Sequence, residues 1–133
     1  MAAKPSLLIV DDEVNITRTL QMVFEREGYE VLPAYSAAEA IAILQNGHSV
    51  QAVITDLNME REDIGLKVAE VAARVRPKPV VVICTGFASI QNSQQALQMH
   101  VDYLATKPVN LDELKLVLDR LMRRKLSADS RKK

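Results

Sequence analysis

Val80-Val81-Val82-Ile83-Cys84 is apolar at every position, and this run is the clearest indicator of the fold class. A strand with apolar side chains on both faces is typical of the centre of a parallel sheet that helices cover on both sides. Four further short runs rich in apolar residues predict strands at Ser6–Val10, Tyr29–Ala34, Val50–Thr55 and Val101–Ala105. The run at residues 80–84 is therefore the fourth of five predicted strands.

Helical patterns lie between these runs. Apolar residues recur every three or four positions in Asn15–Glu27, and Gly28 stands where a helix-ending glycine is expected. Ser36 and Glu39 form a capping box, which predicts the start of a second helix. Further helices are predicted from about Ile64 to Val75, around Ile90–Met99, and from Leu111 after the capping residue Asn110.

Alternating strands and helices of this kind predict an α/β fold with a single, doubly wound, five-stranded parallel sheet, a (βα)5 arrangement. We expect the flavodoxin-like strand order 2-1-3-4-5. The length of 133 residues fits one domain. We expect an N-terminal tail at residues 1–5, the domain at residues 6–122 and a basic tail or linker at residues 123–133. Within that tail, Ser127–Lys133 is predicted to be disordered.

Composition excludes several classes of protein. The longest apolar run has five residues, far short of the roughly 18 needed for a membrane span, and no signal-peptide core is present. The single cysteine, Cys84, excludes a disulfide framework, so a cytoplasmic protein without membrane contact is expected. Seven basic and two acidic residues lie between Asp119 and Lys133, which leaves a charge of −5 on the rest of the neutral chain. Direct nucleic-acid binding by the domain is therefore not expected.

Polar side chains follow four of the predicted strands. Asp11 and Asp12 follow the first strand, Asp56 the third, Thr85 the fourth and Lys107 the fifth. Sites in open parallel sheets lie beyond the carboxyl ends of the strands, and the expected order makes these four strands neighbours. Taken alone, Asp11 or Asp12 could be a helix cap, Asp56 a loop residue, Thr85 a turn or cap residue and Lys107 a solvated side chain. The joint pattern predicts one cleft that contains all five.

This set of residue types is suited to phosphoryl transfer. Three carboxylates close together repel one another unless a cation is present, and oxygen ligands without histidine or cysteine favour Mg²⁺ or Mn²⁺. Lys107 and Thr85 add a positive charge and a hydroxyl group that can bind phosphoryl oxygens. Asp56, alone at the tip of a central strand, is the expected nucleophile, which would form an aspartyl phosphate.

Four segments resemble the receiver domain of bacterial two-component response regulators. They are Leu8–Glu13, Thr55–Met59, Cys84–Gly86 and Lys107–Pro108, and the resemblance extends over Ser6–Leu121. It implies a phosphoprotein of signal transduction that takes part in a phosphorelay rather than an enzyme with a separate substrate. It also implies a sensor histidine kinase or phosphotransfer protein as donor, and a downstream effector or output domain as recipient of the signal. A phosphorylation-dependent dimer is compatible with it.

The resemblance also assigns roles to residues. Asp56 is the phosphoacceptor, and Asp12, Asp56 and the backbone carbonyl of Asn58 hold the metal ion, with Asp11 binding it through water. Thr85 and Lys107 bind the phosphoryl oxygens and switch the surface around the fourth helix, the fifth strand and the last helix. The peptide bond between Lys107 and Pro108 is expected to be cis.

The sequence departs from the family pattern in three places. Glu60 replaces a usual proline, and Gly65 comes one residue later than the usual glycine, so the loop at residues 59–65 is predicted to be one residue longer. Leu104 occupies the usual aromatic switch position and Tyr103 precedes it. Either the strand bulges and Tyr103 serves as the switch, or a typical tyrosine switch is absent.

The resemblance also implies that two positions tune the lifetime of the phosphoryl group. Asn58 follows Asp56 by two residues and Phe87 follows Thr85 by two. Phe87 would hinder the hydrolytic water, which predicts a long-lived phosphoryl state.

Three alternatives compete with the receiver interpretation. A small aspartate-nucleophile phosphatase of the haloacid-dehalogenase type would need a second aspartate two residues after Asp11, where Glu13 stands. A flavodoxin-like cofactor carrier would need a phosphate-binding loop where Asp11–Val14 is acidic. A pseudo-receiver, an interaction module that works without phosphate, is compatible with the altered loop.

Overall fold

The computed structural model describes residues 4–59, 61, 63–86 and 101–131. Phe87 and the predicted helix at Ile90–Met99 lie outside these residues, so both stay predictions. The described helices and strands are β1 (Ser6–Val10), α1 (Val14–Arg26), β2 (Glu30–Ala34), α2 (Ala37–Gln45), β3 (Ala52–Asp56), α3 (Ile64–Arg74), β4 (Val80–Thr85), β5 (Tyr103–Thr106) and α5 (Leu111–Arg131).

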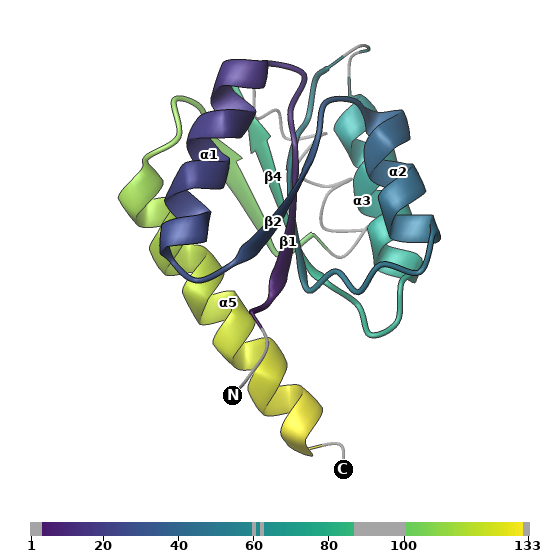
Figure 1. Ribbon diagram of the computed structural model, residues 1–133, viewed down its shortest axis with the longest axis vertical. Helices are drawn as coiled ribbons and strands as arrows, with labels where there is room; N and C mark the ends of the chain where they lie inside the picture. Colours follow the sequence, from purple (N-terminus) through teal and green to yellow (C-terminus); the bar gives the residue numbers. More distant parts are fainter. Residues whose placement is uncertain (1–3, 60, 62, 87–100, 132–133) are drawn as a thin grey trace.

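The five strands form one parallel sheet in the order β2-β1-β3-β4-β5, which confirms the predicted order. Every residue of β3 and β4 is buried, as expected for the central strands of a sheet covered on both sides. Helices α1 and α5 cover one face, and α2 and α3 cover the other (Figure 1). Because all five strands are parallel, the carboxyl ends of β1 and β3, after Val10 and Asp56, lie at the same end of the sheet.

Two hydrophobic clusters hold the helices to the sheet. On the α2–α3 face the buried residues include Leu8, Val10, Ala40, Leu44, Val53, Leu57, Val68, Ala72, Val81 and Ile83. On the α1–α5 face they include Leu7, Ile9, Leu20, Phe24, Ile54, Val82, Cys84, Ala105, Leu114 and Leu118. Successive strand residues alternate between the two clusters, because side chains alternate between the faces of a strand.

Three of the predicted helix ends are confirmed. Gly28 has a φ of 96°, and the bonds Gly28 N–H to Glu25 carbonyl and Tyr29 N–H to Phe24 carbonyl end α1. Ser36 Oγ accepts a hydrogen bond from the Glu39 amide at 3.1 Å. Asn110 Oδ1 accepts one from the Glu113 amide at 3.0 Å. Each cap satisfies backbone groups that have no partner inside the helix.

The prediction of disorder at Ser127–Lys133 was wrong as far as Arg131, because α5 continues to that residue. Residues 119–126 consist of good helix formers and one aspartate, and Arg123 pairs with Asp119 one turn earlier at 3.1 Å. The helix therefore runs through the predicted domain boundary at residue 122 and extends beyond the sheet (Figure 1). No helix among the described residues is long and apolar enough to cross a membrane.

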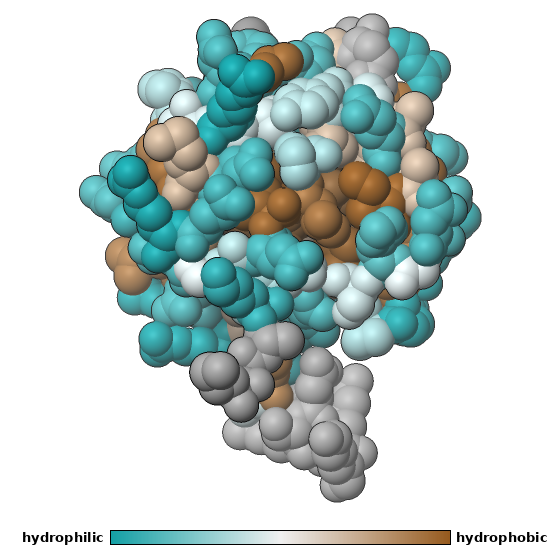
Figure 2. All heavy atoms as spheres, viewed as in Figure 1, coloured by the Kyte–Doolittle hydropathy of each residue, from teal (hydrophilic) through white to brown (hydrophobic). Residues whose placement is uncertain are grey.

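The edge strand β2 has one side exposed between α1 and α2. Figure 2 shows hydrophobic side chains there, with polar residues around them. Pro33, which pairs in register with Ile9, lies in this strand. A proline is tolerated at an edge because its missing N–H is not needed by a second neighbour. The edge position of β2 also leaves the polar ends of the four other strands contiguous.

Candidate phosphoacceptor site

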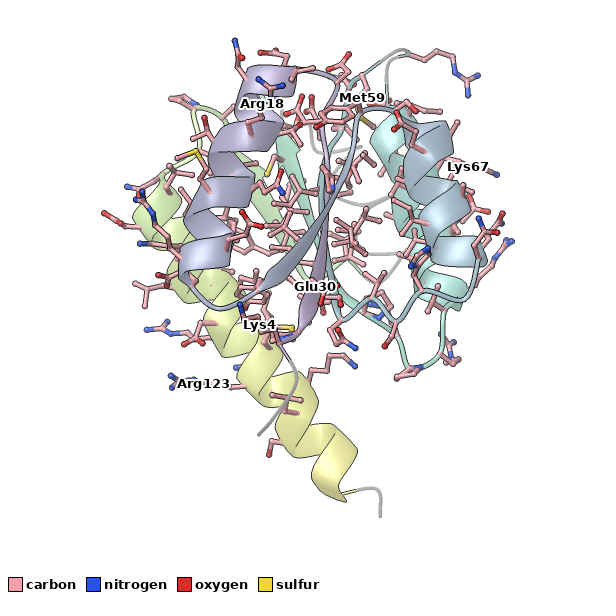
Figure 3. All side chains as sticks on the ribbon, viewed as in Figure 1. Lys4, Arg18, Glu30, Met59, Lys67 and Arg123 are labelled. Carbon is pink, nitrogen blue, oxygen red and sulfur yellow. The ribbon has the colours of Figure 1, made fainter. Side chains whose placement is uncertain are left out.

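The carboxyl ends of β1, β3, β4 and β5 meet at one end of the sheet. The Leu57 amide donates to the Cys84 carbonyl at 2.9 Å, and the Lys107 amide donates to the Thr85 carbonyl at 2.8 Å. These bonds continue the sheet past its last paired residues and bring the predicted site residues to the same edge. Arg18 of α1 and Met59 lie at this end in Figure 3, whereas Lys4 and Glu30 lie at the opposite one.

Lys107 bridges two of the predicted acidic residues. Its Nζ lies 3.0 Å from Asp56 Oδ1 and 3.9 Å from Asp11 Oδ2. Asp11, Asp12 and Asp56 each offer a carboxylate oxygen, and these three oxygens lie within 4.8 Å of one another. Asp11 and Asp56 are only 4% and 8% exposed, while Asp12 is exposed. The structure thus brings three acids and one lysine together, as the sequence predicted.

Burial and neighbouring charges shift the pKa values of Asp11 and Lys107. The pKa of Asp11 is raised above its usual 3.8, chiefly by burial and further by the nearby Asp56 charge, against the lowering effect of the hydrogen bond from the Glu13 amide. Burial lowers the pKa of Lys107, but its hydrogen bond to Asp56 and the charges of both acids outweigh that effect and raise it. Lys107 therefore stays a cation that partly neutralises the acid cluster.

Thr85 is the last residue of β4 and is buried. Its backbone carbonyl accepts from the Lys107 amide at 2.8 Å, so the ends of β4 and β5 are directly joined. The peptide bond between Lys107 and Pro108 is cis, as expected. The sheet thus places Thr85 beside the strand end that carries Lys107.

Several hydrogen bonds hold the described part of the loop between β3 and α3. The Gly65 amide donates to the Leu57 carbonyl at 2.8 Å, and the Asp63 amide donates to Asn58 Oδ1 at 2.7 Å. A Cβ at Gly65 would overlap the Asp56 carbonyl oxygen and come 2.7 Å from Leu57 Cα. Glycine is therefore required here by the close approach of α3 to the end of β3, a reason that the sequence pattern did not contain.

Asp63 adopts a left-handed conformation, with a φ of 60°, which aspartate tolerates better than most residues. Glu60 lies outside the described residues. The Asn58 side chain is engaged within the loop through the Asp63 amide, and its role in tuning the phosphoryl lifetime stays a prediction.

Tyr103 and Leu104 lie on opposite faces of β5. The pairing with β4 is continuous from Tyr103 to Thr106, so this part of the strand contains no bulge. Tyr103 packs against the α1–α5 cluster, and its hydroxyl donates to Glu113 Oε1 of α5 at 3.0 Å. Leu104 packs against the α2–α3 cluster. Of the two sequence alternatives, the bulged strand is therefore not the one observed, and the identity of the switch residue stays a prediction.

This sheet order and cluster lead to a known family. The family model for the response regulator receiver domain matches residues 7–119. The chain belongs to this family. Receiver domains are the regulatory domains of response regulators in two-component signalling, so the resemblance seen in the sequence is confirmed. Family membership favours the receiver interpretation over the phosphatase and cofactor-carrier alternatives.

Curated relatives and solved structures agree with the family. The transcriptional regulatory protein GlrR of Escherichia coli K12 is 37% identical over 120 residues, which cover 90% of this chain and 27% of GlrR. The alginate biosynthesis transcriptional regulatory protein AlgB of Pseudomonas aeruginosa is 39% identical over 83% of this chain and 24% of AlgB. A CheY-like receiver domain protein from Methanospirillum hungatei has a TM-score of 0.88 at 28% identity, covering 94% of this chain and 98% of that one. The chain spans about a quarter of those two curated relatives.

A cavity of about 390 Å³ in this receiver domain is lined in part by Asp11, Asp56 and Lys107. Its walls come mainly from α1, the sheet and the start of α5, and include Ile16, Leu20, Ile54, Cys84, Val109, Leu111 and Leu114. Burial raises the pKa of the Cys84 thiol to about 12, so the thiol stays protonated. The sequence predicted a cleft at the strand ends with Asp11, Asp56 and Lys107, but it did not indicate the apolar walls, because each of these apolar residues also suits a filled core.

Proposed function

We propose that this receiver domain is a phosphorylation-dependent switch that accepts a phosphoryl group onto Asp56. One observation carries the proposal: Lys107 Nζ lies 3.0 Å from Asp56 Oδ1, inside a cluster of three carboxylates at the carboxyl end of the sheet. A carboxylate placed beside a fixed ammonium group and two further acids can take up a phosphoryl group only if the added negative charge is neutralised. Lys107 supplies one positive charge and a divalent cation would supply the rest.

The donor set fits Mg²⁺ or Mn²⁺. Asp11, Asp12 and Asp56 offer only carboxylate oxygens, and no histidine or cysteine joins the cluster among the described residues. Hard cations of this kind prefer oxygen ligands and retain several waters. We assign Asp12, Asp56 and the Asn58 carbonyl as direct ligands and Asp11 as a ligand through water. When bound, the metal ion supplies charge neutralisation for the phosphoryl oxygens.

The proposed transfer starts from a phosphohistidine of a sensor kinase or phosphotransfer protein. An Asp56 carboxylate oxygen attacks the phosphorus, the P–N bond breaks, and the imidazole leaves with the bonding electron pair and takes up a proton. Lys107 and Thr85 bind oxygens of the new phosphoryl group. Hydrolysis of the resulting acyl phosphate by water releases inorganic phosphate and restores the carboxylate, and Phe87 is proposed to slow this step.

Signal output is proposed to leave through the surface around β5 and α5. Lys107 and Thr85 stand directly beside β5, so their movement toward a phosphoryl group would shift the population of conformations there. The segment 90–99, which we also assign to this surface, lies outside the described residues. The recipient is proposed to be an output domain or effector, and the compartment to be the cytoplasm.

Intact-mass measurement tests the proposal. The protein is incubated with acetyl phosphate in Mg²⁺ buffer, beside an Asp56→Asn variant and a sample with excess chelator. We expect one added phosphoryl group in the first sample and none in the other two. The same mass in all three samples, repeated with beryllofluoride and no change in the amide spectrum, would favour the phosphate-independent interaction module instead.

A further inference from the structure

Thr17 is a buried threonine whose hydroxyl reaches out of its own helix. It lies in α1 with an exposed fraction of 0%. Its Oγ1 lies 2.9 Å from the backbone carbonyl oxygen of Asp11, at the end of β1, and 3.2 Å from the carbonyl oxygen of Glu13. The bond to Glu13 is the common one from a helical threonine to the carbonyl four residues earlier. The shorter bond to Asp11 is not explained by helix geometry.

Thr19 shows what a threonine in the same helix does without that second contact. Its hydroxyl donates to the Asn15 carbonyl at 2.9 Å, four residues earlier, and its side chain is exposed. An exposed hydroxyl costs nothing to retain, since water can replace its partner. Burying a hydroxyl carries a desolvation penalty that valine, which has the same shape, would avoid. The hydroxyl of Thr17 is therefore best explained by what it holds.

Hydrogen bonds hold both backbone polar groups of Asp11 and one of its carboxylate oxygens, while the other, Oδ2, lies 3.9 Å from Lys107 Nζ. Its amide donates to the Ala34 carbonyl at 3.1 Å, and its Oδ1 accepts from the Glu13 amide at 2.9 Å. Thr17 holds the other backbone group, the carbonyl oxygen. That carbonyl belongs to the peptide plane that joins Asp11 to Asp12, so its direction sets how the two carboxylates are turned relative to each other.

We propose that Thr17 is a positioning residue, which orients the peptide between Asp11 and Asp12 so that their carboxylates meet a divalent cation together with Asp56. This inference rests on the proposed metal-dependent function. Groups that orient metal ligands commonly change metal affinity 10- to 100-fold when they are removed. Because Thr17 acts through the backbone, the lower end of that range is expected.

The test is a Mg²⁺ titration of the full chain followed by amide NMR, with four variants. Thr17→Val removes the hydroxyl and keeps the shape, and Thr17→Ser keeps the hydroxyl. Thr19→Val is the matched control, since it removes a helical threonine hydroxyl that does not touch Asp11. We expect Thr17→Val to raise the Mg²⁺ Kd about tenfold and the other two to leave it within about twofold. Thr17→Ala replaces the valine variant if that one does not fold.

The outcomes separate this inference from the proposed function. If the unmodified chain binds Mg²⁺ and Thr17→Val binds it equally well, the positioning role is wrong while the metal site stands. If the unmodified chain does not bind Mg²⁺, the proposed function fails. The positioning role of Thr17 is then tested by the metal-free spectra. Displaced amide signals of Asp12 and Glu13 in Thr17→Val, absent from Thr19→Val and Thr17→Ser, would support the positioning role, and unchanged signals would overturn it.

Discussion

On the α2–α3 face of the sheet, β1 contributes Leu8 and Val10, which are fully packed among apolar side chains. On the α1–α5 face, the same strand contributes Leu7 and Ile9 and then continues to Asp11, which shares a cluster with Asp56 and Lys107. The first face is apolar along most of its length and ends in two buried, uncharged hydroxyl residues, Thr55 and Thr85. The second is apolar along most of its length and charged at its end.

The two faces also differ in how closely their helices pack against the sheet. Helix α3 approaches β3 so closely that only glycine fits at residue 65. Between α1 and the start of α5, a cavity of about 390 Å³ lies beside the acid cluster. At these two places the α2–α3 face is packed without space for an added methyl group, while the α1–α5 face leaves a cavity beside charged side chains.

We expect the largest loss of stability from a substitution on the tightly packed α2–α3 face. Gly65→Ala would place a Cβ against the Asp56 carbonyl and Leu57 Cα, and backbone would have to move. We expect a loss of about 2–4 kcal/mol in the free energy of unfolding, measured by urea denaturation. Gly86→Ala is the control, because among the described residues no atom other than those of its chain neighbours lies within 4 Å of its Cβ position. Equal losses of unfolding free energy in both variants would contradict the close packing of α3 against β3.

The second prediction compares the stability lost when either of two similarly buried leucines is replaced by alanine. Leu44 of α2 is 5% exposed within the α2–α3 cluster, and Leu20 of α1 is 8% exposed and lines the cavity. We expect Leu44→Ala to cost about 2–4 kcal/mol and Leu20→Ala about 1 kcal/mol less, because a side chain beside a void has fewer packing partners to lose. Urea denaturation of both variants measures the difference, and a larger cost for Leu20→Ala would reverse the comparison.

We expect the smallest change in stability from removing the charge of Asp11 on the α1–α5 face. Because the pKa of Asp11 is raised above its usual 3.8, this residue contributes stability below that pH and loses the contribution as pH rises through its folded-state pKa. At neutral pH the ionised Asp11 therefore opposes folding of the metal-free chain. We expect Asp11→Asn to raise the thermal midpoint at pH 7 in the presence of a chelator, and the gain to shrink as pH falls toward 4.

Saturating Mg²⁺ provides the control for that measurement. If the carboxylate is useful only with a cation, Mg²⁺ should raise the midpoint of the unmodified chain more than that of Asp11→Asn. A variant that is less stable than the unmodified chain at pH 7 without metal would contradict the sign derived from the Asp11 pKa.

The fold could be predicted from local patterns because each one has a direct physical cause. The β-branched run at Val80–Cys84 requires cover on both faces, and Gly28, Ser36 and Asn110 satisfy specific backbone groups at helix ends. The cluster of Asp11, Asp56 and Lys107 could be predicted because parallel strands bring their carboxyl ends to one edge. Periodicity and topology together were sufficient for these features.

Other features depend on contacts that sequence spacing does not contain. The need for glycine at residue 65 comes from the distance between α3 and the end of β3. The hydrogen bond from Thr17 to the Asp11 carbonyl joins a helix to a strand end, and threonine in an amphipathic helix carries no sign of it. The continuation of α5 past residue 126 depends on the helix that precedes it, because extending an existing helix is easier than starting one, and Ser127, Asp129 and Ser130 alone do not favour a helix.

The most direct test of the account is to identify the phosphorylated residue chemically. Protein treated with acetyl phosphate and Mg²⁺ is reduced with borohydride, which converts an aspartyl phosphate into homoserine, and the digested peptides are sequenced by mass spectrometry. We expect homoserine at residue 56 and unchanged aspartate at residues 11 and 12. Homoserine at Asp11 or Asp12, or a phosphoryl group that borohydride does not convert, would contradict this expectation.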